Sequence, residues 1–83
     1  MTFFIYILYS ESLDSFYVGA TEDIETRLKE HLWKHKGFTS KAKDWELKYS
    51  ESFATKAEAI LREKQIKKWK SRKMIETLIN SKN

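Results

Sequence analysis

Residues 3–9 read Phe3-Phe4-Ile5-Tyr6-Ile7-Leu8-Tyr9, and residues 16–19 read Phe16-Tyr17-Val18-Gly19. Aromatic and β-branched residues at this density are typical of buried strands, because they pack well on a pleated surface. The stretch between them, residues 10–15, is mostly polar and suits the loop of a hairpin. The sequence therefore predicts two adjacent strands, with Tyr6 on one and Tyr17 on the other.

A helical pattern follows the second run. Ile24, Leu28 and Leu32 recur every four residues, which places them on one face of a helix. Acidic residues cluster at its start and basic residues at its end, as the helix macrodipole favours. Gly37 then fits the left-handed position that often follows a helix. We therefore predict a helix from about residue 24 to a cap at Gly37.

The remaining chain predicts one more strand and two more helices. Residues 45–53 alternate between apolar and polar side chains, which is typical of a strand with one buried face, and the apolar set is Trp45, Leu47, Tyr49 and Phe53. Thr55 and Glu58 have the spacing of a capping box, so a helix begins there and continues through Trp69. Ser71 can cap a last helix. The predicted order is ββαβαα, in which a small sheet covered by helices buries the apolar faces.

Length and composition limit the class of protein. The chain has 83 residues, which is room for a single domain over residues 1–83. It has no cysteine, so it forms neither a disulfide framework nor a thiolate zinc site. No apolar run is long enough to span a bilayer, and no signal pattern is visible. We expect no membrane association and a cytoplasmic location.

Positive charge is concentrated toward the C-terminus. Residues 56–73 hold eight Lys or Arg and two Glu, a net charge of +6, whereas the whole chain carries only +4. Such a segment suits a nucleic-acid backbone, because cations that neutralise phosphates release condensed counterions. The side chains expected to form this basic strip are Lys64, Lys67, Lys68, Arg72 and Lys73. Lys41, in the polar stretch 38–41, is a further phosphate-contacting candidate. The alternative is that these cations form only a solvated surface.

Four motifs in this order resemble the GIY-YIG endonuclease domain family, and within it small single-domain proteins related to the N-terminal nuclease module of the repair subunit UvrC. They are Phe4-Ile5-Tyr6 in place of Gly-Ile-Tyr, Tyr17-Val18-Gly19 in place of Tyr-Ile-Gly, Arg27 with His31, and the segment 61–67 that contains Glu63. The resemblance covers nearly the whole chain. It implies an α+β fold with a three-stranded antiparallel sheet flanked by helices, which agrees with the order ββαβαα.

The resemblance also implies a reaction. Members hydrolyse DNA phosphodiesters with one divalent cation, so we expect a monomeric endonuclease that uses Mg²⁺ or Mn²⁺ in DNA repair or processing. The implied site comprises Tyr17 as the base for the attacking water, Tyr6 as its partner or substitute, Arg27 as the ligand of the scissile phosphate, Glu63 as the metal ligand, and His31 as a proton relay or phosphate ligand. Neighbouring cations would have to lower a tyrosine pKa from about 10 to about 7.

Two positions depart from the family pattern. Phe4 stands in place of the first glycine, which affects only strand packing. Ala20 follows Gly19 where the repair subunit carries a lysine that assists deprotonation of the tyrosine. Lys41 and His31 are the candidates to replace that lysine, and the sequence does not distinguish between them.

Each candidate site residue also has a structural alternative. Both tyrosines could simply pack in the sheet. Arg27 lies four residues after Asp23, and Glu63 lies four residues before Lys67, which are the spacings of surface ion pairs worth about 0.3–0.5 kcal/mol each. The chain would then be a non-catalytic nucleic-acid-binding module or a basic protein-interaction domain. A nuclease this small could in turn depend on an unidentified protein partner for targeting.

Overall fold

The fold was described from a computed structural model, which covers residues 2–33 and 42–81. Its elements are, in chain order, β1 (Phe3–Ser10), β2 (Ser15–Thr21), α1 (Ile24–Trp33), β3 (Trp45–Phe53), α2 (Lys56–Trp69) and α3 (Arg72–Asn80). The strands form one sheet in the order β2-β1-β3, and both pairings are antiparallel. The predicted α+β fold and the order ββαβαα are therefore confirmed.

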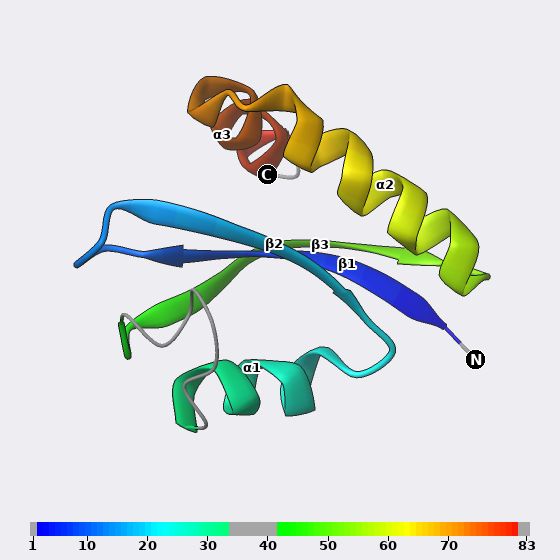
Figure 1. The fold of residues 1–83 in the computed structure, drawn as a ribbon, viewed down its shortest axis with the longest axis horizontal. Helices are drawn as coiled ribbons and strands as arrows, with labels where there is room; N and C mark the ends of the chain where they lie inside the picture. Colours follow the sequence, from blue (N-terminus) through cyan, green and yellow to red (C-terminus); the bar gives the residue numbers. More distant parts are fainter. Residues whose placement is uncertain (1, 34–41, 82–83) are drawn as a thin grey trace.

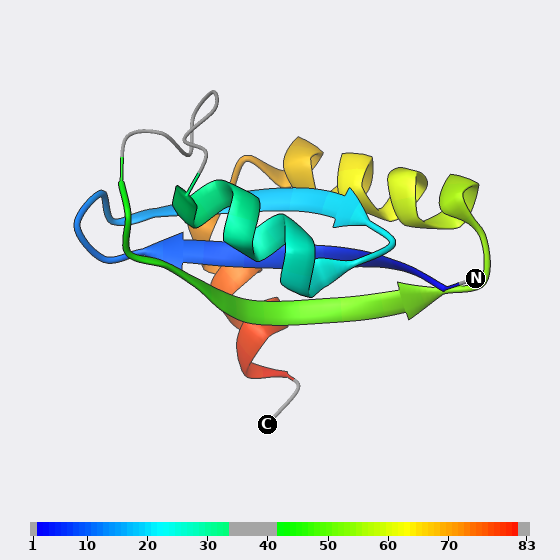
Figure 2. The same ribbon diagram turned by 90° about the horizontal axis from the view of Figure 1, so that it is seen from below.

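The sheet lies between two helical layers. Figure 1 shows α2 and α3 on one face of the sheet and α1 on the other, and Figure 2 shows the sheet from the side of α1. Because β1 is the central strand and both of its faces are covered, its residues 5–8 are all at most 2% exposed. An unbroken apolar run is the expected sequence for such a strand, since neither face meets water.

Each face of the sheet has its own buried cluster. The cluster beneath α2 and α3 consists of Ile5, Ile7, Val18, Tyr49, Ala59 and Ile66. The cluster beneath α1 consists of Tyr6, Leu8, Ala42 and Trp45. Alternate residues of β1 thus contribute to opposite clusters, as the two-residue period of a strand requires.

The prediction that strand 45–53 has only one buried face is wrong. Between Leu47 and Tyr49 the pairing with β1 skips Lys48, so β3 contains a bulge. An extra residue reverses the alternation of side chains from that point onward. Trp45 therefore packs in the cluster beneath α1, whereas Tyr49 packs in the cluster beneath α2 and α3. Leu47 remains 41% exposed.

The predicted helix starts agree with the structure. Thr55 Oγ1 accepts a hydrogen bond from the Glu58 backbone N–H at 3.2 Å and donates one to Glu58 Oε1 at 3.0 Å, so the capping box is confirmed. Ser71 Oγ accepts from the Met74 backbone N–H at 3.3 Å and caps α3. The predicted cap at Gly37 lies outside the described residues. Within the described ranges, no helix is long and apolar enough to cross a membrane.

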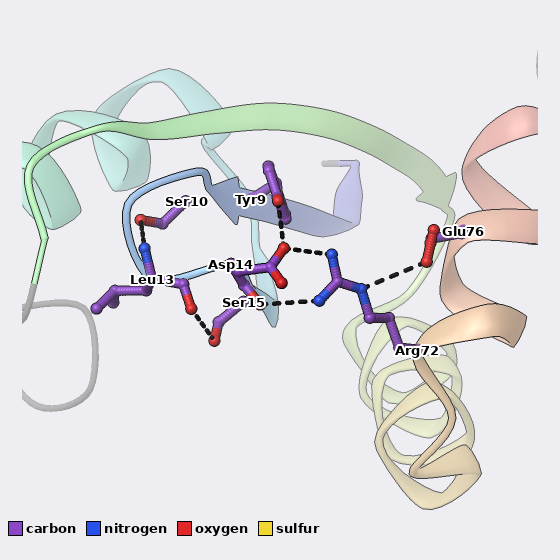
Figure 3. A network of polar contacts seen from close by, with 7 residues as sticks. All are labelled: Tyr9, Ser10, Leu13, Asp14, Ser15, Arg72 and Glu76. Carbon is purple, nitrogen blue, oxygen red and sulfur yellow. Dashed lines mark hydrogen bonds and ion pairs between the residues drawn. The ribbon is translucent and has the colours of Figure 1, made fainter.

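Arg72 ties α3 to the β1–β2 hairpin. Figure 3 shows its guanidinium paired with the Asp14 carboxylate, and it also donates to the Asp14 backbone carbonyl at 3.1 Å and lies 3.4 Å from Glu76 Oε1. The guanidinium lies over the rings of Phe16 and Tyr9, at 5.6 and 6.0 Å from their centroids. The Tyr9 hydroxyl donates to Asp14 Oδ1 at 2.6 Å. Asp14 thus neutralises Arg72 and positions it.

We expect the substitution Asp14→Asn to lower the melting temperature by a few degrees at pH 7. Hydrogen bonds from Arg72 and Tyr9 lower the Asp14 pKa to about 2. An unfolded aspartate has a pKa near 3.9, so this carboxylate stabilises the fold above about pH 4, and the stabilisation is lost as the pH falls toward 2. The melting temperatures of wild type and variant should converge over that range, which circular dichroism can measure.

The substitution Asp14→Asn removes the negative charge of the side chain without changing its size. Asp14 has a φ of 50°, which asparagine also tolerates, so the variant keeps the backbone conformation of the turn. Glu11→Gln, an exposed carboxylate in the same turn, is the control and should melt like the wild type. A difference between Asp14→Asn and wild type that persists unchanged to pH 2 would contradict this account.

Candidate active site

A cleft of about 600 Å³ opens at the β2 edge of the sheet, between α1 and the first half of α2. Its walls come from β1, β2, α1, α2 and the segment after β2. The lining residues are Phe3, Tyr6, Tyr17, Gly19, Ala20, Thr21, Glu22, Arg27, Lys56, Ala59, Ile60 and Glu63. The fold therefore brings together four of the five predicted catalytic residues. The fifth, His31, belongs to α1, and its side chain lies outside the described part of the structure.

Gly19 makes room for the Tyr6 ring. The two residues lie opposite each other in the β1–β2 pairing. A Cβ atom at position 19 would lie only 2.6 Å from Tyr6 Cζ, so a larger residue there would force the ring to move. The Tyr6 and Tyr17 ring centroids are 6.3 Å apart, and Tyr17 packs edge-on against Trp45 at 6.4 Å. The glycine of the Tyr-Val-Gly motif thus sets the position of Tyr6 relative to Tyr17.

Tyr6 is a weaker acid than an ordinary tyrosine. Burial, followed by the nearby Tyr17, raises the pKa of Tyr6 to about 12, and the Glu63 carboxylate contributes in the same direction. Arg27 opposes this increase through its charge and through a side-chain hydrogen bond with Tyr6. The Tyr6 hydroxyl is therefore protonated at neutral pH and held by Arg27.

The capping of α1 positions Arg27. The Asp23 carboxylate accepts hydrogen bonds from the Thr26 backbone N–H at 3.1 Å and from Thr26 Oγ1 at 2.8 Å. These bonds begin the helix, and the Arg27 backbone N–H then donates to the Asp23 carbonyl at 3.1 Å. Arg27 consequently lies in the first turn of α1, where the helix adjoins the cleft.

Glu63 combines a place in the cleft with a surface ion pair. Its Oε2 atom lies 2.7 Å from Lys67 Nζ, so the ion pair considered as the structural alternative for Glu63 is present in the fold. The Glu63 side chain is only 20% exposed, whereas that of Lys67 is 51% exposed. The Glu63 carboxylate is thus largely buried in the cleft, and it is paired with a cation that is half exposed to solvent.

The donor atoms of the cleft suit a hard divalent cation. Across residues 2–33 and 42–81, no group of three or more His, Asp or Glu side chains could hold a metal ion by itself. The cleft instead offers the carboxylates of Glu63 and Glu22. One or two carboxylates, completed by water and substrate phosphates, are the usual environment of Mg²⁺. The residues present therefore fit an ion that binds together with a phosphate-bearing substrate.

The predicted phosphate-binding cations are not gathered in this cleft. Lys64 and Lys68 are exposed on α2, Lys73 is exposed on α3, and Lys67 is paired with Glu63. Arg72 is engaged by Asp14 and the hairpin rings. Lys41 lies outside the described residues. The contribution of these six side chains to DNA binding stays a prediction.

Two charged residues of the cleft were missed by the sequence analysis. Lys56, the first residue of α2, and Glu22, just after β2, both line the cleft. Lys56 belongs to the basic segment 56–73, but composition alone does not indicate which of its cations faces β2. The capping box at Thr55 was the available signal, because it places Lys56 at the start of a helix that must pack on the sheet.

Comparison with known proteins matched the chain to a family model and to a solved structure. The sequence model of one family, described as the GIY-YIG catalytic domain, matches residues 2–76, which include both tyrosines, Arg27 and Glu63. The chain is also similar to the UPF0213 protein BH0048 from Bacillus halodurans, whose structure was solved in solution by NMR. The two are 31% identical with a TM-score of 0.61, and the match covers 99% of this chain and 86% of that chain. No curated protein gave a significant match.

Proposed function

The chain belongs to the GIY-YIG catalytic domain family, and we propose that it is a metal-dependent endonuclease that hydrolyses phosphodiester bonds of DNA. The observation that carries this proposal is the cleft that contains Tyr6, Tyr17, Arg27 and Glu63 together. These residues are far apart in the sequence, and a purely structural role would not require them to share one solvent-accessible cavity. We further propose that the protein acts as a cytoplasmic monomer in DNA repair or processing, with a separate partner for targeting.

The two tyrosines have different roles in this proposal. Tyr17 accepts the proton of the attacking water, whereas Tyr6, which is protonated and bound by Arg27, orients the groups around it. Arg27 binds the scissile phosphate and stabilises the negative charge that develops on it in the transition state. Glu63 of α2, with Glu22 from the segment after β2, would hold the divalent ion. That ion, when bound, adds positive charge at the phosphate.

We propose that Lys56 takes the role of the lysine that the repair subunit carries at the position of Ala20. Ala20 and Lys56 both line the cleft, one from β2 and the other from α2. Among the described residues, Lys56 has no ion pair, so its charge is available to the cleft. A second cation beside Arg27 lowers the cost of forming a tyrosinate at neutral pH, since opposite charges nearby favour the ionised form.

A cleavage assay tests the proposed function. Purified protein in excess is incubated with branched, flapped, nicked and plain duplex DNA in the presence of Mg²⁺, Mn²⁺ or EDTA. We expect weak cutting with either metal and none with EDTA, and products with 5′-phosphate and 3′-hydroxyl ends.

Binding of DNA without cleavage would indicate a second candidate function, that of a non-catalytic nucleic-acid-binding module. The Glu63–Lys67 ion pair and the raised pKa of Tyr6 are what a lapsed active site would also contain. A protein that binds these DNAs but leaves all of them intact with both metals would be a nucleic-acid-binding module.

A further inference from the structure

A second cleft, of about 530 Å³, follows the first along β2. It lies between the start of β2, the end of α2 and the start of α3, and Tyr17 lines both clefts. In both ribbon views α2 runs beside β2 (Figure 1, Figure 2). Residues 56–63 of α2 contribute to the first cleft and residues 66–70 to the second, so the second cleft is adjacent to the candidate active site along this helix.

The walls of the second cleft combine an apolar floor with a cationic rim. The partly exposed apolar side chains of its floor are Phe16 and Ile75, which pack against the buried cluster that contains Val18 and Ile66, and Lys67 and Lys70 belong to its rim. A nucleotide has the complementary structure, because its sugar and base are largely apolar on their faces and its phosphate is anionic. Aromatic and apolar contacts with bases, combined with lysine contacts to phosphates, are the usual means of binding single-stranded nucleic acid.

The cations around this cleft are not equally available. Arg72 also lines it, but Asp14 holds the Arg72 guanidinium, as Figure 3 shows. Lys67 forms an ion pair with Glu63, which partly neutralises its charge. Within the described ranges no ion pair engages Lys70, whose backbone adopts the left-handed conformation (φ 47°, ψ 28°) between α2 and α3. Lys70 is thus the cation of this rim with the least neutralised charge, although the sequence analysis did not include it in the basic strip.

The dimensions of β2 suit one strand of DNA. Its seven residues span roughly 20 Å at about 3.3 Å per residue. A DNA strand in a duplex rises about 3.4 Å per nucleotide along the helix axis, and an unpaired strand is more extended, so this length corresponds to at most about six nucleotides. A strand with its scissile phosphate at Arg27 would therefore extend to the second cleft within a few nucleotides.

We propose that the second cleft binds an unpaired nucleotide of the DNA strand that is cut, with its phosphate at Lys67 and Lys70 and its sugar and base against Phe16 and Ile75. This inference rests on the proposed endonuclease function, and it makes DNA with a single-stranded segment beside the cleavage site the preferred substrate. A fully paired strand cannot present a base to the apolar floor.

Binding measurements without cleavage test this inference. Fluorescence anisotropy is recorded with a labelled oligothymidine in EDTA, over a range of NaCl concentrations, for wild type, Lys70→Asn and Lys29→Asn. Asparagine tolerates the left-handed backbone at position 70. Lys29 is exposed on α1 and lines neither cleft. We expect Lys70→Asn to weaken binding several-fold and to reduce the salt slope by about 0.7, and Lys29→Asn to have a smaller effect. Equal effects of the two variants, or no binding of the oligonucleotide by wild type, would overturn the inference.

Two further measurements separate the second cleft from the catalytic function. The NMR signals of the Phe16 ring and of the Ile75 methyl groups should shift when oligothymidine is added, and less when the matching duplex is added. Shifts confined to the first cleft would overturn the inference even if the protein cuts DNA. Conversely, a protein that shows the Lys70-dependent binding but cuts no DNA would refute the proposed function alone.

Discussion

Arg27→Ala is expected to reduce DNA cleavage by about 10²–10³-fold without unfolding the protein. Removal of one preorganised group that stabilises transition-state charge typically has an effect of this size. Arg27 lines the cleft and forms a hydrogen bond with Tyr6, so its loss removes the phosphate ligand and the restraint on Tyr6 together. The side chain is exposed rather than part of either buried cluster, and its truncation leaves no cavity in the core. Single-turnover cleavage and thermal melting measure the two effects.

Lys29→Ala is the matched control for Arg27→Ala. Lys29 lies on the same helix, has a side chain that is 69% exposed, and is paired only loosely with Glu25 at 3.6 Å. It does not line the cleft. Cleavage by this variant should remain within about twofold of wild type, since a surface pair of this kind contributes little. Wild-type cleavage by Arg27→Ala, or a large fall in its melting temperature, would show that Arg27 has a structural role instead.

Glu63→Gln is expected to reduce cleavage by at least about a hundredfold and to weaken the binding of Mn²⁺ measured without DNA. Glutamine keeps the size of the side chain but loses the charge that a hard cation requires. The lost ion pair with Lys67 is an i,i+4 surface pair worth about 0.3–0.5 kcal/mol, so the melting temperature should change little. The loss of activity would therefore be much larger than the loss of stability.

A second carboxylate separates the metal role of Glu63 from its ion pair. Glu25 forms the corresponding i,i+4 pair with Lys29 on α1 and does not line the cleft. Glu25→Gln should retain both cleavage and Mn²⁺ affinity. If Glu63→Gln behaves in the same way as Glu25→Gln, then Glu63 is only the partner of Lys67 and the cleft does not hold the ion through this residue.

Local patterns were sufficient to predict the elements of this fold. The apolar run at residues 5–8 indicated a buried strand, and the hydroxyls of Thr55 and Ser71 do cap α2 and α3. These features depend on residues close together in the chain, whose hydrogen bonds and burial a short segment largely determines. The family resemblance then selected Tyr6, Tyr17 and three further residues as the candidate site, of which four line one cleft.

The arrangement of side chains across the elements depended on the tertiary structure. The bulge at Lys48 reverses the faces of β3, although the alternation of residues 45–53 indicated one buried side. Arg72 belongs to the basic segment, but it forms an ion pair with Asp14 of the β1–β2 hairpin. Lys56 and Lys70, by contrast, line the clefts. The spacing of apolar residues indicates which side of a helix or strand is buried. It does not indicate the register in which that element pairs or packs with its neighbour. The pairing of β3 with β1 and the packing of α2 on the sheet fix these positions in the folded protein, and they determine which of several similar cations reaches each cleft.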